Sequence, residues 1–341
     1  MNSLSRPLSR LLRTLIVTVA ASFSASAIAA TYSNIVVFGD SLSDPGNFFA
    51  KTAIPGVIPG FPPPPYVNGH FSNGLTAPEY VAAYAQTNFG ISTANFAEGG
   101  ATTGTININN GRCVVPSAGG CLAAVPSVGL GLQQEITNYL ATTPVIAPGT
   151  LFFVQGGGNN FFLDAAIGGT ANIFAIPTDL QTAVVRLAGA GAQNIVLQNL
   201  PDLSRTPYGV GLGAVGQAQV AGAVGLVNAG IAQIWAGLSG IVTGFDTFSF
   251  LNQIIANPLA FGITNASTPC ITSAVALAAN CAGYLFFDDV HPTTYVHQLF
   301  SQQLIAVARI PEPSTLALFA VVSFALAMTL RRRRLVRVQA K

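Results

Sequence analysis

A serine follows the first apolar run of the chain in a stretch that has the composition of a turn. The run NIVV at 34–37 is followed by FGDSLSDPGN, which places Ser41 between an aspartate and a leucine. Asp, Ser, Pro, Gly and Asn are ordinary turn residues, so this stretch alone fits a strand-to-helix turn as well as a reactive nucleophile. A serine nucleophile needs a base, a group that orients the base, and an oxyanion hole, and other parts of the chain must supply them.

Two later stretches offer the hydrogen-bond donors of an oxyanion hole. NFAEGGAT at 95–102 carries Gly99 and Gly100, and glycine lets a backbone N–H approach a substrate closely. VQGGGNNFF at 154–162 carries Asn159, whose side-chain amide can donate to an oxyanion. Each of these stretches taken singly is typical of a turn, so their meaning depends on where the fold places them.

The base and the group that orients it come together in FFDDVHPT at 286–293. Asp288 and His291 are three residues apart, so the carboxylate can accept from the imidazole Nδ1–H within one turn. The other ring nitrogen is then free to take a proton from Ser41. Asp289 has the wrong spacing to the histidine for this role.

Short apolar runs alternate with helical stretches, which predicts an α/β fold whose mainly parallel sheet is covered on both faces. The expected strands are 34–38, 93–96, 151–155, 194–198 and 247–250. The expected helices begin near Pro78, Gly131, Thr178, Ala214 and Pro292. Ligands bind at the carboxyl ends of the strands in such a sheet. Three of the four chemical stretches directly follow an expected strand, and the fourth comes near the end of the domain.

Three further segments are predicted to lie around this sheet. Residues 206–245 carry no charged side chain, but they are mostly Gly and Ala with several amides, and their larger apolar residues recur at helical spacing. We therefore expect a helix with one apolar face on the sheet instead of a membrane span. The Pro-rich segment 54–66 cannot be a central strand and is expected to be a stiff surface loop. Residues 99–112 are expected to form a second loop, long and flexible.

In their order along the chain, FGDSLSDPGN, NFAEGG, GGNN (157–160) and DDVH resemble the four motif blocks of the GDSL, or SGNH, hydrolase family. PPYVNGHFSNG and NLPDLSRTP also resemble family segments between the blocks, so the similarity covers nearly all of 34–308. The resemblance implies a flavodoxin-like three-layer α/β/α fold with a mainly parallel five-stranded sheet. It also implies ester hydrolysis without a cofactor or a metal.

Carried over by position, the resemblance makes Ser41 the nucleophile, His291 the base and Asp288 its orienting acid. The expected activity is hydrolysis of a carboxylic ester through an acyl-enzyme. The substrate would be a lipid or an acetylated sugar. The low charge and apolar loops fit acyl chains, whereas a C-terminal sorting signal fits deacetylation of a matrix glycan.

By the same resemblance, the N–H groups of Ser41 and Gly99 and the side chain of Asn159 form the oxyanion hole, with Gly100 as the alternative to Gly99. The third block is usually G-x-N-D, and Asn160 stands here in place of the acid. Because the oxyanion residue is kept, we expect activity to survive. Asn160 and the charge-poor, Gly/Ala-rich body also fit an alternative, a catalytically decayed scaffold that serves as a surface or matrix protein.

Residues 1–29 have the features of a secretory signal peptide. They open with a basic stretch that carries Arg6, Arg10 and Arg13, continue with the apolar run LIVTVAASFSASA and end on the small-x-small pattern Ala27-Ile28-Ala29. This predicts that the hydrolase domain occupies residues 30–310.

Residues 311–341 resemble the PEP-CTERM sorting signal of Gram-negative bacteria. They combine Pro311-Glu312-Pro313, an uncharged apolar stretch at 314–330 and an arginine cluster. The apolar stretch has 17 residues, the lower limit for crossing a bilayer, and the arginines hold its end on the cytoplasmic side. The resemblance implies an exosortase-type processing enzyme as a partner, attachment to the membrane before processing, and the cell surface or extracellular matrix as the destination. A plain C-terminal membrane anchor is the alternative.

The charge of the body differs from that of the whole chain. The full chain has a net charge of +2, but nine of its 14 basic residues lie in the two targeting segments. The body keeps five basic and eleven acidic residues, a net charge of −6. This balance excludes a basic patch for nucleic acid.

Four cysteines in an exported chain predict disulfides. Of the three possible pairings we expect the local one, Cys113 with Cys121 and Cys270 with Cys281, because each pair brackets a Gly-rich or polar loop. Metal binding is disfavoured, since the chain has no CxxC and its only histidines are at 70, 291 and 297. His70 stands where the family commonly has an arginine, and we expect no functional role for it.

Overall fold

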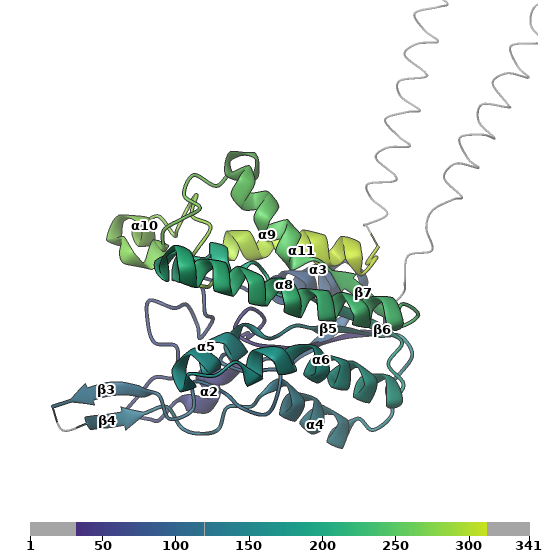
Figure 1. Ribbon diagram of the computed structural model, residues 1–341. Helices are drawn as coiled ribbons and strands as arrows, with labels where there is room; N and C mark the ends of the chain where they lie inside the picture. Colours follow the sequence, from purple (N-terminus) through teal and green to yellow (C-terminus); the bar gives the residue numbers. More distant parts are fainter. Residues whose placement is uncertain (1–31, 119, 312–341) are drawn as a thin grey trace, which may run out of the picture. The chain divides into compact units, whose positions relative to one another are not determined.

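The computed structural model describes residues 32–118 and 120–311, and its centre is a five-stranded sheet (Figure 1). The strands are β1 Asn34–Phe38, β2 Ser92–Asn95, β5 Thr150–Val154, β6 Asn194–Gln198 and β7 Val242–Phe245. They lie in the order β2-β1-β5-β6-β7, and every neighbouring pair is parallel. The predicted α/β class and parallel five-stranded sheet are confirmed. The expected signal peptide at 1–29 and the apolar stretch at 314–330 lie outside the described residues.

Helices cover both faces of the sheet. The larger ones are α3 Ala77–Phe89, α4 Leu132–Thr142, α5 Gly158–Ile167, α6 Ala171–Gly189, α8 Gly213–Gly237, α9 Thr247–Ala256 and α11 Thr294–Val307. The short ones are α2 Asn47–Thr52, α7 Pro207–Gly211 and α10 Ala274–Ala278, with 3-10 turns at Leu203–Arg205, Pro258–Phe261 and Cys270–Thr272. Apolar residues of α4, α6 and α8 form one core with Val36 and Phe38 of β1. Helices α3 and α11 pack against each other and contact the edge strands β2 and β7, so they cover the other face (Figure 1).

Four expected strands lie within one residue of their predicted positions, but the fifth was wrong. The last strand is Val242–Phe245, and the segment predicted as a strand, 247–250, begins helix α9. The side chain of Asp246 accepts a hydrogen bond from the backbone N–H of Ser249, which caps the first turn of that helix. Phe250 and Leu251 are buried on one side of α9. The capping aspartate before this segment therefore favours a helix over a strand.

The expected helix starts agree with the structure at α3, α4, α8 and α11 to within two residues. Helix α6 begins at Ala171, seven residues before the expected Thr178, because the chain accommodates Pro177 inside the helix. Helix α5 was not predicted. It begins directly after Gly157, whose φ of 125° is readily available only to glycine.

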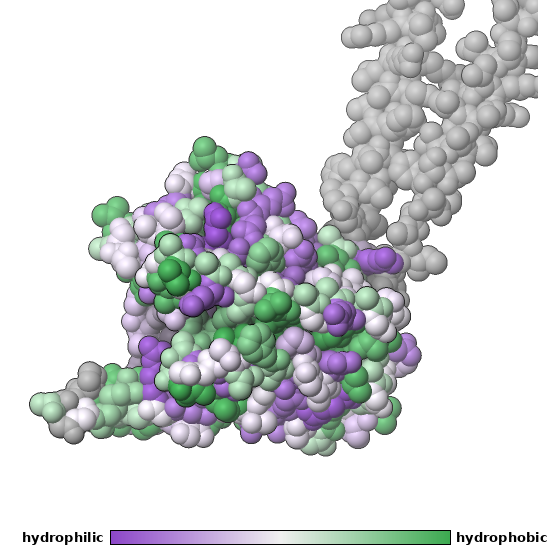
Figure 2. Space-filling model, viewed as in Figure 1, coloured by the Kyte–Doolittle hydropathy of each residue, from purple (hydrophilic) through white to green (hydrophobic). Residues whose placement is uncertain are grey.

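Helix α8 is the apolar, uncharged segment that the sequence predicts to pack on the sheet. Within 32–118 and 120–311 it is the one helix long and apolar enough to cross a membrane. Val224, Val227, Ile231 and Ile234 are nevertheless buried in the core that α8 shares with α6 and the sheet. Val215, one of the larger apolar residues whose helical spacing predicts the apolar face, is instead exposed. Figure 2 shows apolar and polar side chains interspersed on this side of the protein.

The segments between these elements form one antiparallel hairpin and several loops. Strands β3 Cys113–Ser117 and β4 Gly120–Ala124 form an antiparallel hairpin that projects from the body (Figure 1) and was not predicted. The structure joins Cys113 to Cys121 within this hairpin and Cys270 to Cys281 in the loop before α11, the local pairing that the sequence favours. The loop 99–112 is long, as expected, but asparagine amides fasten it: Asn107 and Asn109 donate to the carbonyl of Gly99.

Candidate active site

Ser41 lies at the carboxyl end of β1, in a turn that remote side chains hold in place. The backbone N–H of Gly39 donates to Oε2 of Glu135 at 3.0 Å. The N–H of Asp40 and the hydroxyl of Ser43 both donate to Oε1 of Gln155, each at 3.3 Å. Helix α4 and the end of β5 thereby fix the turn that carries the serine.

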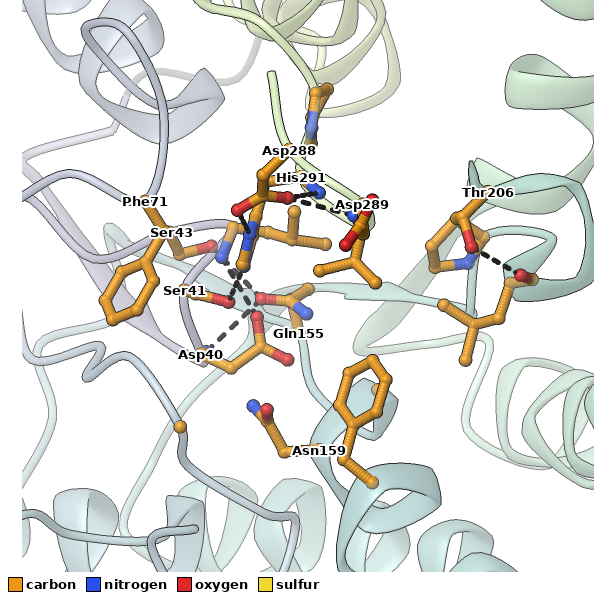
Figure 3. A pocket seen from close by; sticks show the side chains of 18 of the residues that line it. Asp40, Ser41, Ser43, Phe71, Gln155, Asn159, Thr206, Asp288, Asp289 and His291 are labelled. Carbon is orange, nitrogen blue, oxygen red and sulfur yellow. Dashed lines mark hydrogen bonds and ion pairs between the residues drawn. The ribbon is translucent and has the colours of Figure 1, made fainter. Parts of the chain in front are cut away.

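The structure brings Ser41, His291 and Asp288 together, although 250 positions separate the serine from the histidine (Figure 3). His291 Nε2 lies 2.7 Å from Ser41 Oγ, and His291 Nδ1 lies 2.7 Å from Asp288 Oδ2. The ring of Phe71 packs against the imidazole with 5.4 Å between ring centroids. A base within hydrogen-bond reach of the hydroxyl and an acid on its other nitrogen are the geometry that a serine nucleophile needs.

The DDVH stretch forms a tight turn that presents both groups. Asp288 Oδ1 accepts from the backbone N–H of Val290 at 2.9 Å and of His291 at 2.7 Å. The backbone N–H of Phe287 donates across the turn to the carbonyl of His291 at 2.8 Å. Asp288 therefore uses one carboxylate oxygen to shape the turn and the other to hold the imidazole. Asp289 is exposed, and within the described part of the chain its carboxylate makes no hydrogen bond to His291.

Asp288 and His291 each favour the charged form of the other. Burial alone would raise the pKa of Asp288, but the charge and hydrogen bonds of His291 outweigh it, so the pKa of the carboxyl lies below its usual value. Burial alone would lower the pKa of His291, but the charge and hydrogen bond of Asp288 raise it above its usual value. Asp40, itself buried, adds to this upward shift of the histidine pKa.

The expected oxyanion glycine requires a correction, because the N–H of Gly99 is already engaged. It donates to Asp44 Oδ2 at 2.7 Å, and a Cβ at Gly99 would overlap the Phe71 ring. The neighbouring Gly100 lines the cavity beside Ser41, and among the described residues its N–H has no hydrogen-bond partner. Its φ of 91° turns the backbone in a way that glycine adopts readily. The alternative named from the sequence, Gly100, thus fits the geometry and Gly99 does not.

Asn159 and Asn160 are neighbours in the first turn of α5, but they face different surroundings. Asn159 lines the cavity and uses one amide hydrogen to donate to the carbonyl of Ala101 at 2.9 Å, which leaves the other hydrogen for a ligand. Asn160 is buried away from the cavity and accepts from the backbone N–H of Thr103 at 3.0 Å. It also donates to Thr103 Oγ1 and to the carbonyl of Asn172. An aspartate here would lack both donors, so the amide suits this site.

One cavity of about 650 Å³ at the carboxyl edge of the sheet is lined by Ser41, Gly100, Asn159, Asp288 and His291. Most of its lining is apolar and includes Phe61, Phe71, Ile108, Phe162, Leu203, Leu251 and Phe300. Arg112 also lines the cavity, with its guanidinium 5.2 Å from the centre of the Phe61 ring. The third histidine, His297, also lines this cavity, whereas His70 is bound elsewhere, between the carbonyl of Val67 and the carboxylate of Glu79.

Several residues that shape the site had no predicted role, although Asp44 and Tyr66 lie in stretches that resemble family segments. Gln155 and Glu135 hold the serine turn, and Asp44 takes the Gly99 N–H. Tyr66, the last residue of the Pro-rich segment, donates its hydroxyl to Asp288 Oδ2 at 2.7 Å across 222 positions. Such contacts become visible only when the fold brings distant segments together.

A parallel sheet with a serine at the carboxyl end of its first strand, facing a histidine and an aspartate from a late turn, is typical of serine hydrolases built on α/β folds. Comparison with known proteins narrows this class. Residues 35–304 match the family of GDSL-like lipases and acylhydrolases. The chain therefore belongs to that family of carboxylic ester hydrolases, as its motif blocks indicate. Residues 309–334 match the PEP-CTERM protein-sorting motif, which implies export and sorting in a Gram-negative bacterium.

Two curated relatives have similar levels of identity. The thermolabile hemolysin of Vibrio parahaemolyticus is 27% identical over 290 residues, which span 80% of this chain and 62% of the hemolysin. The phosphatidylcholine-sterol acyltransferase of Aeromonas hydrophila is 27% identical over 327 residues, which span 80% of this chain and 88% of the acyltransferase. Among solved structures, a catalytic mutant of Axe2, an acetylxylan esterase from Geobacillus stearothermophilus, is 13% identical with a TM-score of 0.47, covering 82% of this chain and 96% of its own.

Proposed function

We propose that the protein is an exported serine esterase that hydrolyses carboxylic esters through an acyl-enzyme. Ser41 Oγ attacks the ester carbonyl while His291 Nε2 takes its proton, and Asp288 holds the imidazole and stabilises the imidazolium. The imidazolium then gives the proton to the leaving alcohol. Water, deprotonated by His291, attacks the acyl-enzyme and releases the acid and the free serine. The observation that carries this proposal is the continuous chain from Ser41 Oγ to His291 to Asp288, with 2.7 Å at each step.

The oxyanion that forms during both attacks needs donors on the side of the serine away from the histidine. We assign this role to the backbone N–H groups of Ser41 and Gly100 and to the free amide hydrogen of Asn159. Neither backbone N–H has a hydrogen-bond partner among the described residues, and all three residues line the cavity. Preorganised donors of this kind typically contribute about 2.7–4 kcal/mol each to the transition state.

The cavity favours acyl chains longer than acetyl. Its volume of about 650 Å³ and its mostly aromatic and aliphatic lining offer far more apolar contact than an acetyl group can use. Each buried CH2 contributes about 0.8 kcal/mol, roughly fourfold in kcat/KM. We therefore expect kcat/KM for p-nitrophenyl esters to increase from acetate to medium-chain esters. Highest activity on acetate would contradict this substrate class and favour an acetylated sugar.

The activity itself is tested by the same assay with two variants. Ser41→Ala and His291→Ala are each expected to lose nearly all esterase activity, because members of such a unit act together. A Ser41→Ala protein that keeps its activity would overturn the mechanism. An inactive wild-type protein, folded and tested over the full series of esters, would favour the alternative of a decayed scaffold with a surface or matrix role. Asn160 is part of the support for a decayed scaffold, but the amide that replaces the usual acid makes three hydrogen bonds. The replacement is therefore explained without loss of catalytic activity.

We further propose that the chain is made with a signal peptide at 1–29, and that an exosortase-type enzyme processes the tail after export to the cell surface or matrix. The match to the sorting motif at 309–334 and the two local disulfides support this route, because disulfides form in the oxidising periplasm. Mass spectrometry of the mature C-terminus tests it. A peptide that contains Met328 or Arg331 in the surface-exposed protein would rule out processing.

A further inference from the structure

The Pro-rich segment at 54–66 has no part in the mechanism described so far, yet it ends on a residue that touches the catalytic unit. Tyr66 Oη lies 2.7 Å from Asp288 Oδ2, the oxygen that also lies 2.7 Å from His291 Nδ1. The other oxygen of Asp288 accepts the two backbone N–H groups of its own turn. The carboxylate is thereby bonded on both oxygens, and Tyr66 supplies the one side-chain hydroxyl among these contacts.

The ring of Tyr66 packs against two other aromatic rings, with its hydroxyl on Asp288. It packs edge-on against Phe287 with centroids 5.1 Å apart and against Phe71 with centroids 6.1 Å apart. Phe71 in turn contacts the ring of His291. Burial and the nearby charge of Asp288 raise the pKa of Tyr66, so the hydroxyl stays protonated and is the donor of this hydrogen bond.

We propose that Tyr66 is a positioning residue of the catalytic unit, which fixes the carboxylate of Asp288 and draws part of its charge away from His291. This proposal rests on the proposed serine esterase mechanism. A donor on Asp288 Oδ2 competes with the imidazole for the same oxygen and makes the carboxylate a weaker partner for the imidazolium. Tyr66 therefore keeps His291 easier to deprotonate, so that more of the enzyme holds a free base near neutral pH.

Four other titratable or charged groups lie near His291 or Tyr66 and also influence their pKa values. Asp40 faces His291 from the end of β1, and His297 approaches it from α11. Asp289 and Arg112 lie close enough to act on Tyr66 with opposite signs. None of these four makes a hydrogen bond to Asp288 in the described part of the chain. Removal of the Tyr66 hydroxyl therefore takes away one hydrogen bond of the carboxylate and leaves the surrounding charges unchanged.

The test is Tyr66→Phe, which removes the hydroxyl and keeps the ring contacts. We expect the acid limb of the kcat/KM profile to move to higher pH by about half a unit to one unit, since a hydrogen bond to a charged group is lost. At the alkaline plateau, kcat should fall by a factor of about 3 to 10. Tyr80→Phe is the matched control, because it removes one hydroxyl that bonds Thr294 outside the cavity at 2.8 Å. It should leave the acid limb unchanged.

Two further measurements separate positioning from mere support of the loop. The pH midpoint of the low-field His291 Nδ1 proton resonance should rise in Tyr66→Phe, and this reading needs no esterase activity. In an Asp288→Asn background, Tyr66→Phe should cost no further kcat, because the two side chains act as one unit. An unchanged His291 midpoint, or additive losses in the cycle, would overturn the proposal. Absence of ester hydrolysis by the wild type would instead contradict the proposed function and leave the His291 titration to decide the role of Tyr66.

Discussion

Substitution of Asn159 and of Asn160, neighbours at the start of α5, should affect catalysis in one variant and stability in the other. Asn159→Ala removes a donor that faces the cavity, whereas Asn160→Ala removes three hydrogen bonds, which join α5 to Thr103 and to Asn172. The two variants make the same chemical change at neighbouring positions, so each serves as the control for the other.

The expected magnitudes follow from these contacts. Loss of one oxyanion donor costs about 2.7–4 kcal/mol in the transition state, so kcat of Asn159→Ala should fall by a factor of about 10² to 10³. KM should change little, because the bond strengthens mainly in the transition state. Its lost bond to Ala101 costs about 1 kcal/mol of folding free energy, a few degrees in melting temperature.

Asn160→Ala should behave in the opposite way. It leaves the buried backbone N–H of Thr103 without the partner that Asn160 provides, at about 1–3 kcal/mol, and it removes the bonds to Thr103 Oγ1 and to the carbonyl of Asn172, at about 1 kcal/mol each. The melting temperature should therefore fall by about 10 °C, while kcat of the folded protein stays within about fivefold of the wild type. Steady-state kinetics with a p-nitrophenyl ester and thermal unfolding of the same samples measure both effects. Reversed phenotypes would refute the assignment of Asn159 to the oxyanion hole.

Further predictions concern pH and the disulfides. The pKa of His291 is raised and its neutral form is the base, so kcat/KM should increase with pH through a midpoint above about 6.5 and be lost below it; a midpoint below 6.5 would contradict the Asp288–His291 pairing. Burial works against the charged form of His70, but its bonds to Glu79 and Val67 raise its pKa, so it contributes stability below about 6.5 that is lost as pH rises through the raised value. His70→Ala should flatten that part of the melting temperature profile, and an unchanged profile would show that His70 is not the titrating group. The Cys270–Cys281 bridge packs against Phe287 beside Asp288, so its replacement by alanines should lower kcat and should lower the free energy of unfolding by about 2–3 kcal/mol. Replacement of Cys113 and Cys121 in the exposed hairpin should change kcat by less than about twofold, and equal effects of the two bridges on kcat would contradict this distinction.

The sequence predicted the parts of the fold and site that depend on local pattern. Runs such as 34–38 and 194–198 are apolar and short, so they identify strands that are buried on both faces. Asp288 and His291 lie in one tight turn, so their spacing alone indicates that they can meet. The error at 247–250 arose because four residues in which phenylalanine alternates with Thr and Ser fit a short strand as well as the start of a helix, and Asp246 decides between them by capping the helix.

The remaining features depend on contacts between distant segments. Gly99 and Gly100 are equivalent in the sequence, and only the carboxylate of Asp44, 55 positions away, shows which N–H is engaged. Tyr66 reaches Asp288 across 222 positions from a segment whose prolines indicate only a loop. The loop at 99–112 looks flexible because it is rich in Gly and Asn, yet the same asparagine amides fasten it by bonding backbone carbonyls.

The central claim is that Ser41 is an activated nucleophile, and reaction with a fluorophosphonate tests it most directly. Incubation of the folded protein should add one phosphonyl group per chain, and peptide mass spectrometry should locate it on Ser41. Labelling should be lost in Ser41→Ala and strongly slowed in His291→Ala, because the imidazole takes the proton of the hydroxyl. A wild-type chain that remains unlabelled while fully folded, or one labelled at a different serine, would contradict the assignment of Ser41 as the nucleophile.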